Sequence, residues 1–245
     1  MFLKSSLLNQ FDDLVFGFST KLFNHKHSPF FSNMSLEIGD DKTIVEKNRK
    51  VFTDYLGISL EQVAYQHQIH SDIVSYVTQP GFIGESDAMI TDKTNLALTV
   101  GSADCTTVFI YDYKQKIIAA IHSGWQGTQK RIVEKTILKL QREFHSNQQD
   151  CVAYIAPSIS MKNYEVGKDF LTKFDEKYFL CSNGKYYLNV AAANYDMLIN
   201  NGIDKSRIQF SNLCSFENTD LFHSYRRDKE NSGRAWGLIM MKDYE

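Results

Sequence analysis

The sequence has little of what marks secreted, membrane-spanning or multidomain chains. Its 245 residues include only three prolines and four cysteines. The cysteines lack paired spacing, so they predict neither a disulfide framework nor a clamp for structural zinc. No run of about 18 apolar residues occurs, which excludes a membrane-spanning helix. No Gly/Ser-rich tract indicates a linker between domains.

An excess of one charge sign is also missing. Lys and Arg number 27 against 29 Asp and Glu, so the formal net charge is −2. Scattered basic residues form no stripe for a phosphate backbone, and we expect no nucleic-acid partner and no membrane partner. Gln10, Asp12 and Asp13 interrupt the first apolar run before a signal-peptide core forms. We therefore expect a cytoplasmic protein with reduced thiols.

Hydrophobic content of 43% lets a chain of this length bury a full core, and we predict a single domain over residues 1–245. Strands are expected at 63–65, 73–77, 87–91, 96–101, 107–112, 117–122, 151–156 and 237–241. Helices are expected after Asp41 up to Gly57, from Val133 to Phe144, around Lys168 to Lys177, and from Val190 to Asn200. The fold class predicted is α/β (α+β type), with mixed β-sheets flanked by helices.

Three metal-binding side chains follow or close apolar runs of strand type. They are His70 in "HQIHSDIV", Cys105 in "SADCTTVFIYD" and His122 in "IAAIHSGWQGT". At strand ends facing one cleft, they would fill three corners of a zinc tetrahedron and leave the fourth open, which is the catalytic pattern. Spacing alone is equally compatible with buried packing residues, because free cysteine is among the most buried residue types.

The densest polar segment is "FHSYRRDKENSGR", which leads into the last expected strand. Guanidinium groups such as those of Arg226, Arg227 and Arg234 suit bidentate capture of phosphate or carboxylate. The alternative is a solvated surface pair of arginines with Asp228 as the local partner.

Six motifs in order resemble the bacterial polyphenol-oxidase-type, or laccase-domain, family. They are "QIHSDIV", "SDAMITDKTNLALTVGSADCTTVFIYD", "IAAIHSGWQGT", "IAPSISMKNYEVG", "LCSFENTDLFHSYRRDKENSGR" and "GLIM". The resemblance implies a single α/β domain with zinc held by His70, Cys105 and His122. It also implies a purine nucleoside phosphorylase that cleaves adenosine, inosine, guanosine and methylthioadenosine with phosphate and deaminates adenosine. Members have also been described as peptidoglycan editing factors.

This sequence departs from the family pattern at positions that concern phosphate. Gln126 stands for the usual Arg, Thr107 for the usual Pro, and Lys21 lies where an early Arg followed by two glycines is usual. Lysine is a point charge and glutamine is neutral, so both changes bear on phosphate affinity. Arg226, Arg227 and Arg234 match the family pattern and are candidate phosphate ligands. Lys21, which does not match, is a fourth candidate.

A self-contained multicopper oxidase is chemically implausible, because its copper centres need on the order of ten histidines and this chain has seven. Adventitious copper at a Cys/His/His site would follow the Irving–Williams order. For deamination, Asp104, Asp87 and His67 are candidate proton shuttles, and the adjacency of Asp104 to Cys105 favours it as a catalytic residue.

Two rival hypotheses remain. In a cysteine hydrolase, Cys105 would be the nucleophile and His122 its base. In a catalytically silenced zinc-binding protein, zinc and ligands would bind without turnover.

Overall fold

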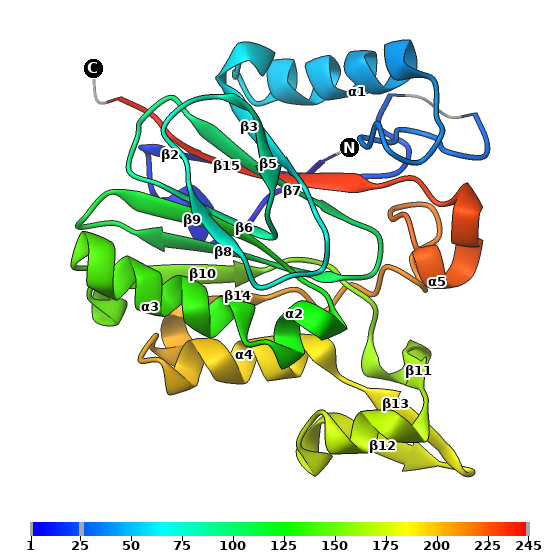
Figure 1. The fold of residues 1–245 in the computed structure, drawn as a ribbon. Coiled ribbons are helices and arrows are strands. Elements are labelled where there is room, and N and C mark those ends of the chain that lie inside the picture. The colour runs from blue at the N-terminus through cyan, green and yellow to red at the C-terminus, as the bar shows by residue number, and fades with distance from the viewer. Residues whose placement is uncertain (1, 25–26, 244–245) are drawn as a thin grey trace.

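The computed structural model describes residues 2–24 and 27–243, and these form a helix–sheet–sheet–helix stack (Figure 1). The first six-stranded sheet has the order β1 (Phe2–Leu3), β2 (Leu14–Ser19), β15 (Ala235–Met241), β7 (Ala97–Ser102), β3 (Val63–His67) and β5 (Gly81–Glu85). The second has the order β14 (Ile208–Phe210), β10 (Cys151–Ile155), β8 (Thr106–Asp112), β9 (Ile117–Ser123), β6 (Ala88–Thr91) and β4 (Val74–Tyr76). Both sheets mix parallel and antiparallel pairs.

Helices cover the two outer faces of this stack. Helix α1 (Lys42–Tyr55) lies on the first sheet, and α3 (Ile132–Phe144) and α4 (Val190–Asn200) lie on the second, with α2 (Trp125–Gln129) beside them (Figure 1). A short α5 (Tyr225–Asp228) precedes β15. A small third sheet of β11 (Glu165–Val166), β13 (Lys185–Leu188) and β12 (Phe179–Ser182) stands at the periphery.

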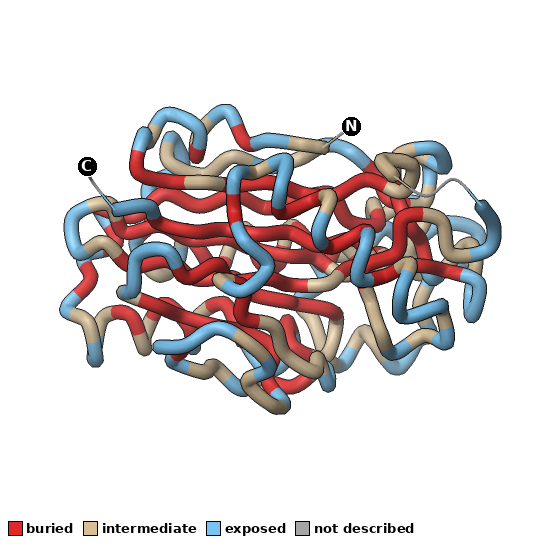
Figure 2. Tube along the Cα trace, turned by 90° about the horizontal axis from the view of Figure 1, so that it is seen from above, coloured by how far each residue is buried: buried red, intermediate tan, exposed pale blue. Residues whose placement is uncertain are grey.

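Alternating side chains explain why strands of the second sheet are apolar on both faces. In β8, Phe109 and Tyr111 pack between the sheets, whereas Val108 and Ile110 pack toward α3 and α4. Successive strand residues point to opposite faces, so a strand covered on both sides needs a continuous apolar run. Figure 2 shows the resulting buried strands through the interior, with exposed residues concentrated in the connecting loops.

The structure confirms the predicted fold class and the expected strands and helices, with one exception. Residues 168–177, expected to be helical, form the short 3₁₀ segments Lys168–Thr172 and Glu176–Tyr178. Neither segment has a buried residue, and a helix gains most of its stability in a protein by packing an apolar face. Strand β2 and the short strands β1, β5, β11, β12, β13 and β14 were not expected from the sequence. None of the described helices combines the length and apolar character needed to cross a bilayer.

Candidate metal centre and active-site cavity

Strand ends bring His70, Cys105 and His122 together. His70 follows β3, Cys105 directly precedes β8, and His122 lies in β9. Strands β8 and β9 form an antiparallel hairpin in which Thr107 pairs with His122 and Thr106 with Ser123. This register sets Cys105 beside His122, and the loop after β3 supplies His70 from the other sheet.

The donor atoms of these three residues suit a single metal ion. They all lie within 4.8 Å of one another, and Cys105 Sγ is 3.9 Å from His70 Nε2. Ligand atoms around tetrahedral zinc are roughly 3.3–3.8 Å apart, given the usual zinc–ligand bond lengths. Small side-chain rotations would bring the three donor atoms to the separations found around zinc. Among the residues described, it is the one group of three or more His, Cys, Asp or Glu side chains with metal-site geometry.

Asp87 holds two of the three candidate ligands in place. Its buried carboxylate accepts backbone hydrogen bonds from Ile69, His70 and Ser71, and one from the Ser71 hydroxyl. It also bonds His122 Nδ1 at 2.8 Å, which leaves Nε2 to face the cluster. A carboxylate on the second ring nitrogen is the usual partner of a metal-binding histidine.

Two residues at this centre have a strained backbone. His70 has φ 57° and Asp104, next to Cys105, has φ 91°, both in the left-handed region that costs a non-glycine residue about 1–3 kcal/mol. The hydrogen bonds that Asp87 accepts from the 69–71 backbone offset that cost at His70. Such strain typically persists where surrounding contacts impose a functional geometry.

Gly124 leaves the space in which the cluster sits. A Cβ atom at this position would lie 2.9 Å from Cys105 Sγ and 3.2 Å from His70 Cδ2. Both distances are too short for side chains that must also move to bind a metal. The glycine after β9 therefore keeps the donors unobstructed on that side, as expected for a cradle around an ion.

The electrostatics of the cluster favour a thiolate. Burial opposes ionisation of Cys105, but the charge of His122 and hydrogen bonds from both histidines outweigh it and lower the pKa of the thiol to about 6. Burial likewise disfavours the charged form of His122, yet Cys105 and Asp87 raise the pKa of its imidazole. The thiolate is the form of cysteine that binds metals or attacks electrophiles.

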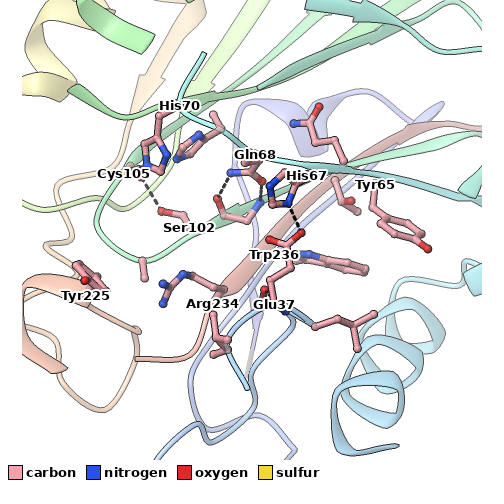
Figure 3. Close-up of a pocket in the computed structure, with 18 of the residues that line it drawn as sticks. Glu37, Tyr65, His67, Gln68, His70, Ser102, Cys105, Tyr225, Arg234 and Trp236 are labelled. Atoms are coloured by element: carbon pink, nitrogen blue, oxygen red, sulfur yellow. Dashed lines mark hydrogen bonds and ion pairs between the residues drawn. The ribbon is translucent and has the colours of Figure 1, made fainter. Parts of the chain in front are cut away.

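The cluster opens into a cavity of about 690 Å³, which is within the size range of small-molecule sites. Figure 3 shows His70 and Cys105 at one end and Tyr65 and Trp236 at the other, with His67 and Glu37 between them. Aromatic side chains at one end and polar groups along the wall suit a ligand with a flat ring and several hydrogen-bonding atoms.

Of the predicted phosphate ligands, Arg234 lines this cavity, together with Tyr225. Its Nη1 donates to the carbonyl oxygens of Ser232 and Gly233, and its guanidinium lies 5.5 Å from the centre of the Tyr225 ring. No hydrogen bond from its Nε or Nη2 to another described residue is found. Arg234 therefore presents donors that can meet an anion.

The other predicted cations lie outside the cavity lining. Arg227 commits all five of its N–H groups to Asp228 and to three backbone carbonyls. Arg226 donates to the backbone of Glu165 and stacks on a tyrosine. Lys21 lies over a phenylalanine ring, 4.0 Å from the Asp228 carboxylate. In this conformation, Arg227 has no donor left for phosphate.

The three candidate proton shuttles are placed very differently. Asp104 is buried, and its carboxylate accepts from the Ser215 hydroxyl and the Arg226 backbone. Asp87 is buried under the His70 loop. Neither lines the cavity, whereas His67 does. The sequence-based preference for Asp104 as a catalytic residue finds no support in this arrangement, because adjacency along the chain did not place its carboxylate in the cavity.

Sequence reasoning missed much of the opposite wall. Glu37 comes from the loop before α1, Arg49 from α1 itself, and Trp236 from β15. Arg49 is buried, donates to the Met34 carbonyl and lies 4.2 Å from the Trp236 ring. These residues are far apart in the sequence, so only the tertiary fold identifies them as neighbours.

The profile of the family described as multi-copper polyphenol oxidoreductase laccase matches residues 15–242. The chain belongs to this laccase family. A relative named purine nucleoside phosphorylase, from Clostridium acetobutylicum, is 32% identical to the chain over 218 residues, which cover 86% of each sequence.

Two solved structures resemble this laccase-family chain over nearly its whole length. YlmD from Geobacillus stearothermophilus superposes with a TM-score of 0.92 at 26% identity, covering 99% of this chain and 96% of that one. The Bacillus licheniformis hypothetical protein YfiH gives a TM-score of 0.89 at 30% identity, with coverages of 96% and 94%. The fold found here is thus the fold of the family.

Proposed function

We propose that this laccase-family protein is a zinc-dependent purine nucleoside phosphorylase acting on adenosine, inosine, guanosine and methylthioadenosine, with adenosine deaminase activity. One observation carries the proposal: a three-donor cluster lines the same cavity as Arg234, whose Nε and Nη2 donate to no other described residue. The name of the Clostridium relative supports the substrate class. We also propose a cytoplasmic location, because all four cysteines are free thiols.

His70, Cys105 and His122 would hold the zinc ion. Three protein ligands with an open fourth position are the donor set of catalytic zinc. Asp87 orients His122 through a hydrogen bond to its second ring nitrogen, as carboxylates commonly do for zinc-binding histidines. When bound there, zinc supplies Lewis acidity and activates water at neutral pH. Copper would also bind such donors, as the Irving–Williams order predicts, without making the site a multicopper centre.

Phosphorolysis requires that phosphate be held against the sugar carbon while the glycosidic bond breaks. We assign this to Arg234, whose guanidinium faces the cavity near Cys105 and Tyr225 (Figure 3). Charge-assisted hydrogen bonds from a guanidinium suit phosphate oxygens. Arg227 has a structural role instead, because its N–H groups donate to backbone carbonyls of the loop before α5.

The activity test is product analysis by chromatography. Zinc-loaded protein is incubated with adenosine, with and without phosphate, beside Cys105→Ala and the control Cys181→Ala, which alters an exposed cysteine on β12. We expect adenine and ribose phosphate only when phosphate is present, and inosine without it. Both should disappear in Cys105→Ala and persist in the control. Full activity in Cys105→Ala would refute the zinc mechanism.

A cysteine hydrolase is the second candidate, because the lowered thiol pKa of Cys105 beside His122 also suits a nucleophile and its base. The two mechanisms separate on metal removal. Activity that survives a chelator and is lost on alkylation would favour the hydrolase. Bound zinc without any turnover would favour the third candidate, a catalytically silenced zinc-binding protein involved in peptidoglycan editing.

A second test separates the two arginines. We expect Arg234→Met to raise the KM for phosphate while leaving deamination of adenosine nearly unchanged. Arg227→Met should lower the stability of the fold instead, because it leaves three carbonyl oxygens without their donor. Equal losses of both activities in Arg234→Met would exclude its assignment to phosphate.

A further inference from the structure

His67 and Glu37 form a hydrogen-bonded pair on the cavity wall that the proposed metal and phosphate sites do not use. Glu37 contacts His67 Nδ1 (Figure 3), and both residues line the same cavity as the cluster and Arg234. Their side chains are 42% and 54% exposed. A ligand and solvent can therefore both reach the pair.

The hydrogen bond determines which ring nitrogen faces a ligand. Because Glu37 occupies Nδ1, the other nitrogen, Nε2, is left to exchange a proton. The pKa of His67 is raised, chiefly by the hydrogen bond and the charge of Glu37, so the imidazolium is more populated than for an isolated histidine. A carboxylate-supported imidazolium is a suitable general acid near neutral pH.

Phosphorolysis of a purine nucleoside needs such an acid. When the bond between C1′ of ribose and N9 of the base breaks, its electron pair moves into the purine, and protonation at N7 neutralises the developing charge. In a purine, N7 lies beside the ring carbon that bears the amino or oxo group. With this carbon at the cluster, a base turned so that its five-membered ring follows the adjoining wall places N7 toward His67, which lies between the cluster and Tyr65.

We propose that His67, supported by Glu37, is the catalytic acid that protonates the departing purine during phosphorolysis; this inference rests on the phosphorylase activity proposed above. The proton moves from Nε2 to N7 as the C1′–N9 bond breaks and a phosphate oxygen bonds to C1′. The proton that hydrogen phosphate loses restores the imidazolium, through solvent at the exposed edge of the ring. Glu37 is a positioning residue, because it acts through His67.

The test compares two nucleosides whose bases differ in their need for a proton. Inosine requires protonation of its leaving base, whereas 7-methylinosine carries a fixed positive charge and departs without one. We expect His67→Gln to lower kcat/KM for inosine about 100-fold, a typical general-acid contribution. Phosphorolysis of 7-methylinosine should stay near the wild-type rate. Glu37→Gln should give a smaller loss in the same direction.

His145→Gln is the matched control, since it changes an exposed histidine at the end of α3, and it should leave both substrates unaffected. Equal losses on inosine and 7-methylinosine in His67→Gln would overturn the acid role and leave the phosphorylase intact. If the wild-type protein cleaves neither nucleoside with phosphate, the proposed phosphorylase fails and the acid role falls with it. A lower kcat/KM of His67→Gln for inosine alone would support both the phosphorylase activity and the acid role of His67.

Discussion

Asp87 should support both the fold and metal affinity, and the substitution Asp87→Asn tests this. Oδ1 accepts from His70 N and His122 Nδ1, and Oδ2 accepts from Ile69 N, Ser71 N and the Ser71 hydroxyl. An asparagine amide replaces one of these oxygens by a donor. At least two hydrogen bonds to a charged acceptor are then lost, whichever way the amide points.

The expected cost follows from those bonds. At about 1.5 kcal/mol for each hydrogen bond to a charged group, two lost bonds lower the free energy of unfolding by about 3 kcal/mol. Zinc affinity should fall about 10- to 100-fold, as for other losses of an outer carboxylate partner. Urea unfolding measures the first quantity, and competition with a zinc chelator measures the second.

Asp72→Asn is the matched control on the same loop. Asp72 is partly exposed and pairs with Lys135 on the surface, so its loss should change the free energy of unfolding by no more than about 1 kcal/mol. The zinc affinity of this variant should equal that of the wild type. If Asp87→Asn behaves like Asp72→Asn in both assays, the reasoning about the buried carboxylate is wrong.

Three further perturbations test other parts of the structure. Gly124→Ala should weaken zinc binding, with little change in thermal unfolding, because its Cβ would approach Cys105 Sγ at 2.9 Å; unchanged zinc affinity would contradict the cradle. Gly237→Ala should lower the free energy of unfolding in urea by about 1–3 kcal/mol, because its Cβ would lie 2.3 Å from Phe109 Cζ between the sheets; unchanged stability would show that the ring shifts freely. Burial opposes ionisation of Asp13, yet hydrogen bonds from a lysine and a tyrosine keep its pKa below 3.8. Its stabilisation is therefore complete above that pH and is lost as the pH falls through the folded-state pKa, so Asp13→Asn should flatten the acid limb of the stability curve measured by urea titration.

The strand-end position of the three candidate metal ligands could be predicted from sequence because local patterns determine it. The apolar runs before His70 and around Cys105 and His122 mark strands, and a short polar turn joins β8 to β9 as a hairpin. In an antiparallel hairpin, the first residues of one strand lie opposite the last residues of the other. Proximity of Cys105 to His122 thus follows from local structure, and the family resemblance adds His70.

The roles of the arginines could not be predicted in the same way. Arg227 and Arg234 are the same residue type in one segment, and both match the family pattern. Their difference arises from tertiary contacts. Backbone carbonyls of the preceding loop accept the N–H groups of Arg227, whereas Arg234 lines the cavity. The sequence shows that a guanidinium group is present, and such a group can bind phosphate. Whether its N–H donors are available depends on the residues that surround it in the fold.

The division of the cavity between elements explains why binding of metal and of substrate should be separable. The end with the candidate metal ligands is formed by the β8–β9 hairpin of the second sheet and by the loop after β3, whose backbone donates hydrogen bonds to the buried Asp87. The opposite wall comes from the loop before α1, the end of β3 and the segment around Arg234. Perturbations at Asp87 or Gly124 should therefore change metal affinity first, whereas those at His67 or Arg234 should change proton or phosphate handling in a protein that still binds zinc.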